Sequence, residues 1–323
     1  MPAVSTSTST IRPAAPPRRG RAALRRWFDS AAPAIATDAD RADRIDWLRA
    51  APFIAMHLAC LAAFWVGVSP VALGVAGAAY AIRMFALTGF YHRYFSHRTF
   101  RTARGVQFAF ALLGASCAQR GPLWWAAHHR QHHRHADAAQ DLHSPQVHGL
   151  LWSHMGWFLT RRAFATDLAQ VPDLARYPEL RWLDRYDTAV PLVLALAMFV
   201  LGMLLARVAP GLGTSGMQML VWGFFVSTVV LFHATVTINS LAHRYGRRRF
   251  ETRDNSRNNL WLALLTFGEG WHNNHHFFPG TARQGFRWWE IDPTYYGLRL
   301  LALLGLVHDL KPLPHWVLAR ASA

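Results

Sequence analysis

The apolar positions of this chain fall into four long runs, at residues 51–68, 70–91, 189–209 and 217–241. A helix that crosses a membrane needs roughly 20 mostly apolar residues, and each run has about that length. The runs form two close pairs, and the short turn inside each pair contains no arginine or lysine. This pattern predicts an all-α integral membrane protein with four membrane-spanning helices. A large soluble helical protein is the alternative, but such paired runs with uncharged turns are uncommon in soluble folds.

A shorter apolar run at residues 105–119 is not expected to cross the membrane. It is too short for a span, and we predict a buried or interfacial helix there. The distinction matters because the chain has histidine clusters on both sides of this run. If the run crossed the bilayer, those clusters would lie on opposite faces of the membrane.

The basic residues lie mostly outside the four runs, in residues 1–50, 92–188 and 242–323. The positive-inside rule then places both termini and the long central loop in the cytoplasm, and we expect a bacterial inner membrane. The net charge of +16 suits an anionic membrane surface or nucleic acid. Nucleic-acid binding would leave the apolar runs without a role, so we expect membrane lipids as partners and no nucleic acid. Arg83, inside the second run, is expected to reach the interface or to face the protein interior.

Residues 1–45 begin with a stretch rich in serine, threonine, proline and arginine that lacks the apolar core of a secretory signal. We predict a disordered basic tail there, and a single membrane domain over residues 46–323. The chain has two cysteines, Cys60 and Cys117. These are too few for a cysteine-ligated iron–sulfur cluster or a four-cysteine zinc site, so nitrogen and oxygen atoms must hold any metal.

Three histidine clusters stand out: "HRYFSH" (92–97), "HHRQHH" (128–133) and "HNNHH" (272–276). The second and third each contain histidines at positions i, i+3 and i+4, which share one face of a helix. His92 and His97 are five residues apart, about 140° around an ideal helix. They must therefore reach two different metal ions, or the helix must break between them. Imidazole suits several transition metals, and the number of nitrogens exceeds what one ion accepts, so we predict a dinuclear site.

The neighbouring apolar spans point to a lipid substrate. The C–H bonds of a lipid chain are inert, so their reaction calls for oxygen chemistry, which iron supplies and redox-inactive zinc does not. The spacing alone would also accept another pair of metals.

The three clusters, together with "INSLAHRYG" (238–246) and "FGEGWHNNHHFFP" (267–279), resemble the membrane fatty-acid desaturases of the delta-9, stearoyl-CoA type. The resemblance extends from about Thr88 to Asp309. It implies four membrane helices under a helical cytosolic cap that holds a dimetal site. The implied ligands are nine histidines: His92, His97, His129, His132, His133, His243, His272, His275 and His276. Asn239 matches a residue that reaches one metal through water.

The resemblance also implies a bent tunnel for the acyl chain. The residues that match its kink are Gln119, Trp125 and Thr235. Family members that act on acyl-CoA carry an Arg-Asp pair just before the second cluster, where this chain has Ala127 and His128. Three other basic residues could face the substrate headgroup: Arg161, Arg162 and Arg120. The acyl carrier therefore stays open between CoA, phospholipid and acyl carrier protein.

The predicted function is oxygen-dependent insertion of a cis double bond, at delta-9, into a saturated acyl chain, with two iron ions as cofactor and O2 as co-substrate. Electrons must come from a separate donor, such as a ferredoxin-, rubredoxin- or cytochrome b5-like protein with its reductase. The alternatives are a related lipid hydroxylase and a non-enzymatic membrane metal-binding protein, whose ligands would lie within the spans.

Further polar residues near the clusters have expected roles. Glu269 could orient a ligand ring, or it could be a helix-end cap or a solvated charge, while His57 and His233 are expected to be satisfied core residues. Histidines that follow the second cluster are expected to hydrogen-bond ligand imidazoles: His135, His143 and His154.

Overall fold

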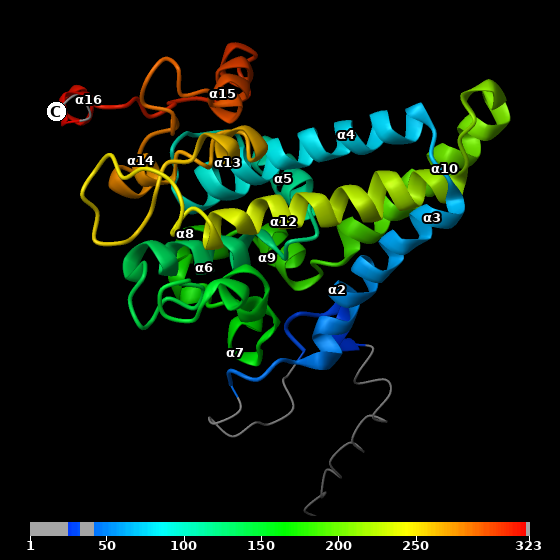
Figure 1. The fold of residues 1–323 in the computed structure, drawn as a ribbon, viewed down its shortest axis with the longest axis horizontal. Coiled ribbons are helices and arrows are strands. Elements are labelled where there is room, and N and C mark those ends of the chain that lie inside the picture. Colours follow the sequence, from blue (N-terminus) through cyan, green and yellow to red (C-terminus); the bar gives the residue numbers. More distant parts are fainter. Residues whose placement is uncertain (1–24, 33–41, 321–323) are drawn as a thin grey trace, which may run out of the picture.

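The computed structural model describes residues 25–32 and 42–320. Over these residues the chain forms helices joined by loops, with isolated β-bridges and no β-sheet. Figure 1 shows long helices running side by side, with most of the shorter helices gathered around one end of them. The described part of the chain is therefore all-α, as predicted.

Four helices are long and apolar enough to cross a membrane, which confirms the four predicted spans. The first consists of α2 (Trp47–Ala59), η2 (Cys60–Ala62) and α3 (Ala63–Val66). The second consists of α4 (Pro70–Phe85) and the π-helix η3 (Ala86–Ser96). The third is α10 (Ala189–Val208), and the fourth consists of α11 (Gly216–Gln218), the π-helix η8 (Met219–Val226) and α12 (Ser227–Ser240).

A tight turn joins the first two spans. The first helix ends at Gly67, whose positive φ of 69° is a conformation that glycine adopts without strain. Ser69 then caps α4 by accepting a hydrogen bond from the amide of Ala72 at 3.2 Å, and Pro70 occupies the first helical position. These three residues fix a helical hairpin without any charged group.

Arg83 faces the protein interior, one of the two expected alternatives. Its guanidinium donates to the hydroxyls of Ser227 at 2.6 Å and Thr228 at 2.7 Å, and to the carbonyl of Ala79 at 3.0 Å. A charged side chain is costly inside a membrane unless such partners satisfy it. The network also links the second span to the fourth.

The remaining helices form the cap, apart from η7 (Pro210–Leu212), which lies in the turn between the third and fourth spans. Between the second and third spans lie α5 (Arg104–Ala115), α6 (Pro122–His135), η4 (Trp152–Gly156), η5 (Trp157–Leu159), α7 (Arg161–Phe164), η6 (Leu168–Gln170), α8 (Pro172–Ala175) and α9 (Pro178–Arg185). After the fourth span come α13 (Leu260–Leu265), α14 (His272–Phe277), α15 (Pro293–Leu303) and α16 (His315–Arg320).

The helix α5 confirms that residues 105–119 do not cross the membrane. It has 12 residues and lies against η3, where Phe110 stacks on Phe90 with ring centroids 3.6 Å apart. Phe110 and Ala111 are buried. The run is apolar because α5 packs against protein, and the histidine clusters on either side of it can meet.

Part of the predicted tail packs against the membrane domain. Residues 1–24 and 33–41 lie outside the described residues. Within residues 25–32, the guanidinium of Arg26 is 2.8 Å from the carboxylate of Asp46, and both side chains are buried. The hydroxyl of Ser30 donates to the carbonyl of Asp184 at 2.9 Å. This segment therefore lies where the first and third spans begin.

Candidate metal centre

Nine histidines from four parts of the chain meet at the cap end of the spans. They come from the end of η3, from α6, from the turn after α12 and from α14. In each of two groups, one nitrogen per imidazole lies within 4.8 Å of all the others. The first group is His92, His97, His129, His133 and His275; the second is His132, His243, His272 and His276.

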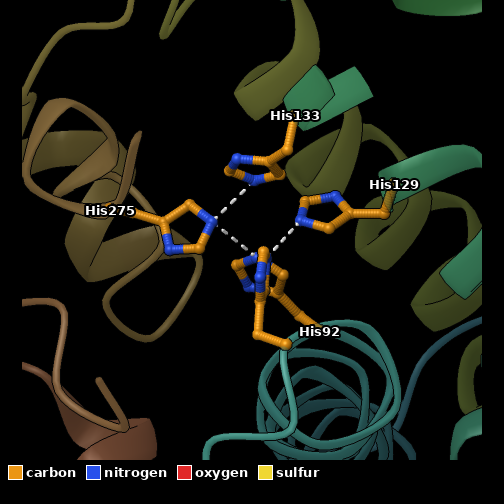
Figure 2. A group of neighbouring side chains, drawn as sticks. His92, His129, His133 and His275 are labelled. Atoms are coloured by element: carbon orange, nitrogen blue, oxygen red, sulfur yellow. Dashed lines mark hydrogen bonds between the residues drawn. The ribbon is translucent and has the colours of Figure 1, made fainter. Parts of the chain in front are cut away.

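The nitrogens of the first group are spaced as ligands of a single ion would be. The Nε2 atom of His275 lies 3.0 Å from that of His92 and 2.9 Å from that of His133. The Nε2 atoms of His97 and His129 are 2.8 Å apart. Two nitrogens bound at right angles to one ion, each at about 2.1 Å, would be about 3 Å apart. Figure 2 shows four of these imidazoles converging on one point, from η3, α6 and α14.

The second group fits a second ion. The Nε2 atoms of His243 and His272 are 2.9 Å apart, and the Nε2 atom of His276 is buried without a hydrogen-bond partner among the described residues. A buried polar atom without a partner is costly, and a metal ion at this point would provide one. Nitrogen donors in these numbers fit two transition-metal ions.

A π-helix decides the relation between His92 and His97. The prediction from sequence assumed α-helical geometry, and it therefore left two possibilities: the two histidines bind separate ions, or the helix breaks between them. In η3 the hydrogen bonds run from residue i+5 to residue i, and the amide of His97 donates to the carbonyl of His92 at 3.2 Å. The wider turn brings both side chains to the same side, where they join the same group.

His243 is the ligand candidate that spacing alone does not reveal. It lies in the turn after α12, has no histidine neighbour in sequence, and is fully buried. The family resemblance pointed to it, and the structure places it beside His272. Its other ring nitrogen, Nδ1, lies 3.0 Å from the carboxylate of Asp137.

A carboxylate lies behind one imidazole of the first group and three of the second. Such a partner fixes the tautomer and orientation of a metal-binding histidine. The pairs are Glu269 with His92, Asp141 with His132 at 2.9 Å, Asp137 with His243 at 3.0 Å, and Asp254 with His276 at 2.9 Å. Glu269 therefore contacts a ligand-candidate ring, which is one of the roles expected for it. The ring is that of His92, however, and not that of His272, which is closer in the sequence.

Burial favours the neutral, metal-binding form of most of these imidazoles. It holds the pKa well below the usual value for His97, His129, His133, His272 and His275. For Asp137, burial raises the pKa, but the interactions with His243 and the hydrogen bonds from Ser144 and the amide of Asn255 together outweigh burial and lower the pKa to about 2. The carboxylates are thus charged and the imidazoles can donate electron pairs, the combination that a bound cation requires.

The comparisons with known proteins agree with this geometry. Residues 68–307 match the family model for "Fatty acid desaturase".

The chain belongs to the fatty acid desaturase family.

It is 36% identical over 289 residues to the sn-2 palmitoyl-lipid 9-desaturase of Nostoc sp. (strain 36). The aligned region covers 87% of this chain and 95% of that relative. It is 35% identical to the sn-1 stearoyl-lipid 9-desaturase of Anabaena variabilis, over 83% of this chain and 94% of the relative. An acyl-CoA 5-desaturase of Anemone leveillei is also 35% identical, over 79% of this chain and 76% of the relative. The protein is accordingly an oxidoreductase that desaturates acyl chains, and its relatives differ in the acyl carrier.

A cavity of about 610 Å³ reaches the candidate metal centre of this desaturase. Its lining includes His129 and Asn239, together with the three residues expected at the tunnel kink, Gln119, Trp125 and Thr235. The side-chain amide of Gln119 donates to the hydroxyl of Thr235 at 3.1 Å. The ring of Trp125 stacks on that of His129, with centroids 5.0 Å apart. The structure thus brings the expected kink residues together beside a candidate metal ligand.

The predicted headgroup residues fall in different places. Arg120 lines the cavity, whereas Arg161 and Arg162, both within the described part of the chain, are not among its lining residues. The guanidinium of Arg162 lies 3.0 Å from the carboxylate of Asp43 on the exposed surface. A role for Arg161 and Arg162 in substrate binding therefore remains a prediction.

Other histidines of the desaturase lie outside both ligand groups. His57 and His233 have hydrogen-bond partners, as expected, although both are half-buried and not in the core: their Nε2 atoms are 3.1 Å apart, and His233 also contacts His154 at 3.1 Å. His154 bonds to Ser240 at 2.9 Å and contacts no ligand imidazole that the structure describes. His128 contacts the carbonyl of Trp124 at 3.0 Å.

His143 stands closer to the metal centre. Its ring packs against that of His132 with centroids 4.3 Å apart, and its Nδ1 atom is 3.6 Å from the carboxylate of Asp141. Since Asp141 also contacts His132, His143 supports a ligand indirectly.

Proposed function

We propose that this desaturase inserts a cis double bond at delta-9 into a saturated acyl chain carried by CoA or phospholipid, with two iron ions held by the nine histidines. The cavity that ends beside His129 and Asn239 is the observation that supports this proposal most directly. It would hold one pair of chain methylenes next to the metal centre while the rest of the chain lies among apolar side chains. Methylenes are chemically alike, so selectivity must come from position.

The proposed reaction removes two hydrogen atoms from adjacent methylenes. With one O2, two electrons and two protons, it yields the alkene and two molecules of water. Iron would supply the one-electron oxygen chemistry that breaks inert C–H bonds. The chain's own residues position the reactants: Trp125 supports the ring of His129, and Gln119 and Thr235 shape the wall at the bend.

The carboxylates behind the imidazoles would keep the centre intact during turnover. Asp141, Asp137 and Asp254 each accept a hydrogen bond from a ring nitrogen that faces away from the ligand group. A fixed ring offers its second nitrogen in one direction only. Asn239, which lines the cavity, is proposed to reach one ion through a water molecule.

The two electrons would come from a separate protein. The described residues form helices, and the sequence has two cysteines, too few for an iron–sulfur cluster of its own. A ferredoxin-, rubredoxin- or cytochrome b5-like donor would reduce the centre. By the positive-inside rule, both termini and the metal centre would face the cytoplasm of a bacterial cell, where such donors are found.

Fatty-acid analysis of a host without its own desaturase tests the proposal. The host would express the wild-type chain, the His132→Ala variant or the His315→Ala variant, together with a compatible electron donor. His132 belongs to the second ligand group, whereas His315 is an exposed residue at the start of α16. We expect new delta-9 cis-monoenes with the wild type and His315→Ala, and none with His132→Ala. Hydroxylated chains, or monoenes that persist in His132→Ala, would contradict the proposal.

A further inference from the structure

Three arginines line the end of the acyl cavity that lies where the spans begin. Arg26 precedes the first span, Arg49 lies in the first turn of α2, and Arg120 is two residues before α6. Asp187, two residues before α10, also lines the cavity there. A membrane helix begins near the lipid headgroups, so these charges lie at the depth of a headgroup and not among acyl chains.

The three guanidiniums lie close together. Those of Arg49 and Arg120 both contact the ring of Phe164, with each central carbon 3.6 Å from the ring centroid. The two charges are therefore no farther apart than twice that distance. Arg26 lines the same cavity and is 7% exposed, and its partner Asp46 also accepts a hydrogen bond from the amide of Arg49 at 3.4 Å. The Nε atoms of Arg26 and Arg49 are buried and have no hydrogen-bond partner among the described residues.

The cluster carries one positive charge more than its carboxylate partners neutralise. Arg26 pairs with Asp46 at 2.8 Å, and Arg120 pairs with Asp187 at 2.9 Å. Arg49 donates to the carbonyl of Ala32 at 3.0 Å and pairs with no carboxylate that the structure describes. Guanidinium groups bind phosphate oxygens through paired N–H donors, and one phosphodiester has a single negative charge. CoA, by contrast, carries several phosphate charges.

The same cavity reaches the side of the protein that faces lipid. Its walls include Pro52 and Ala55 of α2 and Leu192 of α10, and all three residues are exposed. Further along these helices, Leu58 and Leu196 are more than 60% exposed, as expected of side chains that contact acyl chains. The cavity therefore opens between α2 and α10 toward the membrane as well as toward the arginines.

We propose that Arg26, Arg49 and Arg120 bind the phosphate of an intact membrane phospholipid, one acyl chain of which enters the cavity sideways between α2 and α10. The second acyl chain stays in the bilayer, against the exposed faces of these helices. This inference rests on the acyl desaturation proposed above and identifies the carrier as phospholipid instead of CoA.

Competition binding to the purified full-length protein in detergent micelles tests the inference without turnover. Tritiated dipalmitoyl-phosphatidylglycerol is the probe, and the competitors are the same lipid, dipalmitoylglycerol and palmitoyl-CoA. We expect the phospholipid to bind at least about tenfold more tightly than the diacylglycerol, because charge-assisted hydrogen bonds to the phosphate are lost in the latter. Palmitoyl-CoA should compete more weakly than the phospholipid.

The variants separate a phosphate site from general damage. Arg49→Gln should remove most of the preference for phospholipid over diacylglycerol, and Arg49→Lys should retain part of it. Arg101→Gln serves as the control, because Arg101 is an exposed arginine whose nearest carboxylate partner is Asp309 at 3.5 Å. Bound metal per chain, unchanged in all variants, would show that each one is folded.

Tighter binding of palmitoyl-CoA, or equal binding of phospholipid to wild type and Arg49→Gln, would overturn the inference. The result is independent of the host experiment. Monoenes in the host without any phospholipid preference would reject the phosphate site and keep the desaturase proposal. Preferential phospholipid binding without monoenes in the host would support the phosphate site and reject the desaturase proposal.

Discussion

The amide of His97 donates a hydrogen bond to the carbonyl of His92, five residues earlier, at 3.2 Å. This π-helical bond places two histidines, which an α-helix would turn well away from each other, in one ligand group. Such π-turns are rare and are frequently found at functional sites. The local departure from α-helical geometry is thus what completes a five-histidine group.

The assignment of His92 and His97 to one ion predicts the metal content of a double variant. His92→Ala/His97→Ala should keep about one ion per chain, held by the second group. His97→Ala/His243→Ala removes a ligand from each group and should retain far less. Elemental analysis of the purified proteins measures this. His57→Ala/His233→Ala is the matched control, since both residues lie outside the two groups, and it should keep the wild-type content. Loss of both ions from the first variant would show that the two histidines serve different ions.

The carboxylate of Asp254 accepts a hydrogen bond from Nδ1 of His276 at 2.9 Å. Asp254→Asn removes the negative charge while it keeps the size of the side chain. We expect metal affinity at the second group to fall by about 10- to 100-fold, the usual effect of losing such a partner. Titration with a competing chelator gives the affinity. Asp309 is an exposed aspartate that pairs with Arg101, so Asp309→Asn should leave the affinity unchanged. An equal loss in both variants would assign the effect to net charge.

The buried carboxyl of Asp187 is expected to make the stability of the fold depend on pH. Burial raises its pKa to about 6 from the usual 3.8, although Arg120 opposes the shift. A raised carboxyl pKa means that ionising Asp187 destabilises the fold, and the penalty is complete above pH 6, at about 3 kcal/mol. Relative to Asp187→Asn, the wild type should therefore gain stability as the pH falls through 6 toward 4. Thermal unfolding of the two proteins at pH 7.5 and pH 5 measures the difference, which should shrink at the lower pH. A difference that does not change with pH would contradict the shift.

The hydrogen bond between Gln119 and Thr235 is proposed to fix the bend of the acyl chain. Thr235→Val keeps the volume and removes the hydroxyl that accepts the bond from Gln119 at 3.1 Å. We expect the double bond to spread to neighbouring positions, because a looser wall holds the methylenes less accurately. Mass spectrometry of derivatised fatty-acid methyl esters gives the positions. Thr237→Val is the control on the same helix: its hydroxyl bonds to the carbonyl of Ala234, and it does not line the cavity. If the double-bond positions are unchanged in Thr235→Val, the hydrogen bond between Gln119 and Thr235 does not fix the bend.

Local sequence was sufficient for the features that depend on near neighbours. The four apolar runs match the four spans to within a few residues at most ends, because membrane length and helical rise fix the number of apolar residues. The spacing i, i+3 and i+4 placed the three histidines of α6, and the three of α14, on one side of their helices. In both helices, however, the tertiary fold divided the histidines between two groups: His132 serves the second group, and His129 and His133 serve the first.

The family resemblance added what spacing could not supply, above all His243 in the turn after α12. Asp254, which accepts from His276, was not singled out at all, since an aspartate in a loop has no periodic signal. The pairing of Glu269 with His92 could not be predicted either, since these residues are far apart in the sequence and come into contact only through the packing of the cap against η3.

The amino-acid sequence alone predicts a four-span, all-helical protein with enough imidazole on one side of the membrane for two ions. Hydrophobic periodicity and residue spacing encode these features locally, so no partner needs to be known. The three-dimensional fold is needed to know which imidazole nitrogens lie in one group, which carboxylates contact them, and that Arg26, Arg49 and Arg120 line the same cavity. Each of these depends on packing between distant segments, and a π-turn or a buried ion pair is selected by that packing and not by the residues beside it in the chain.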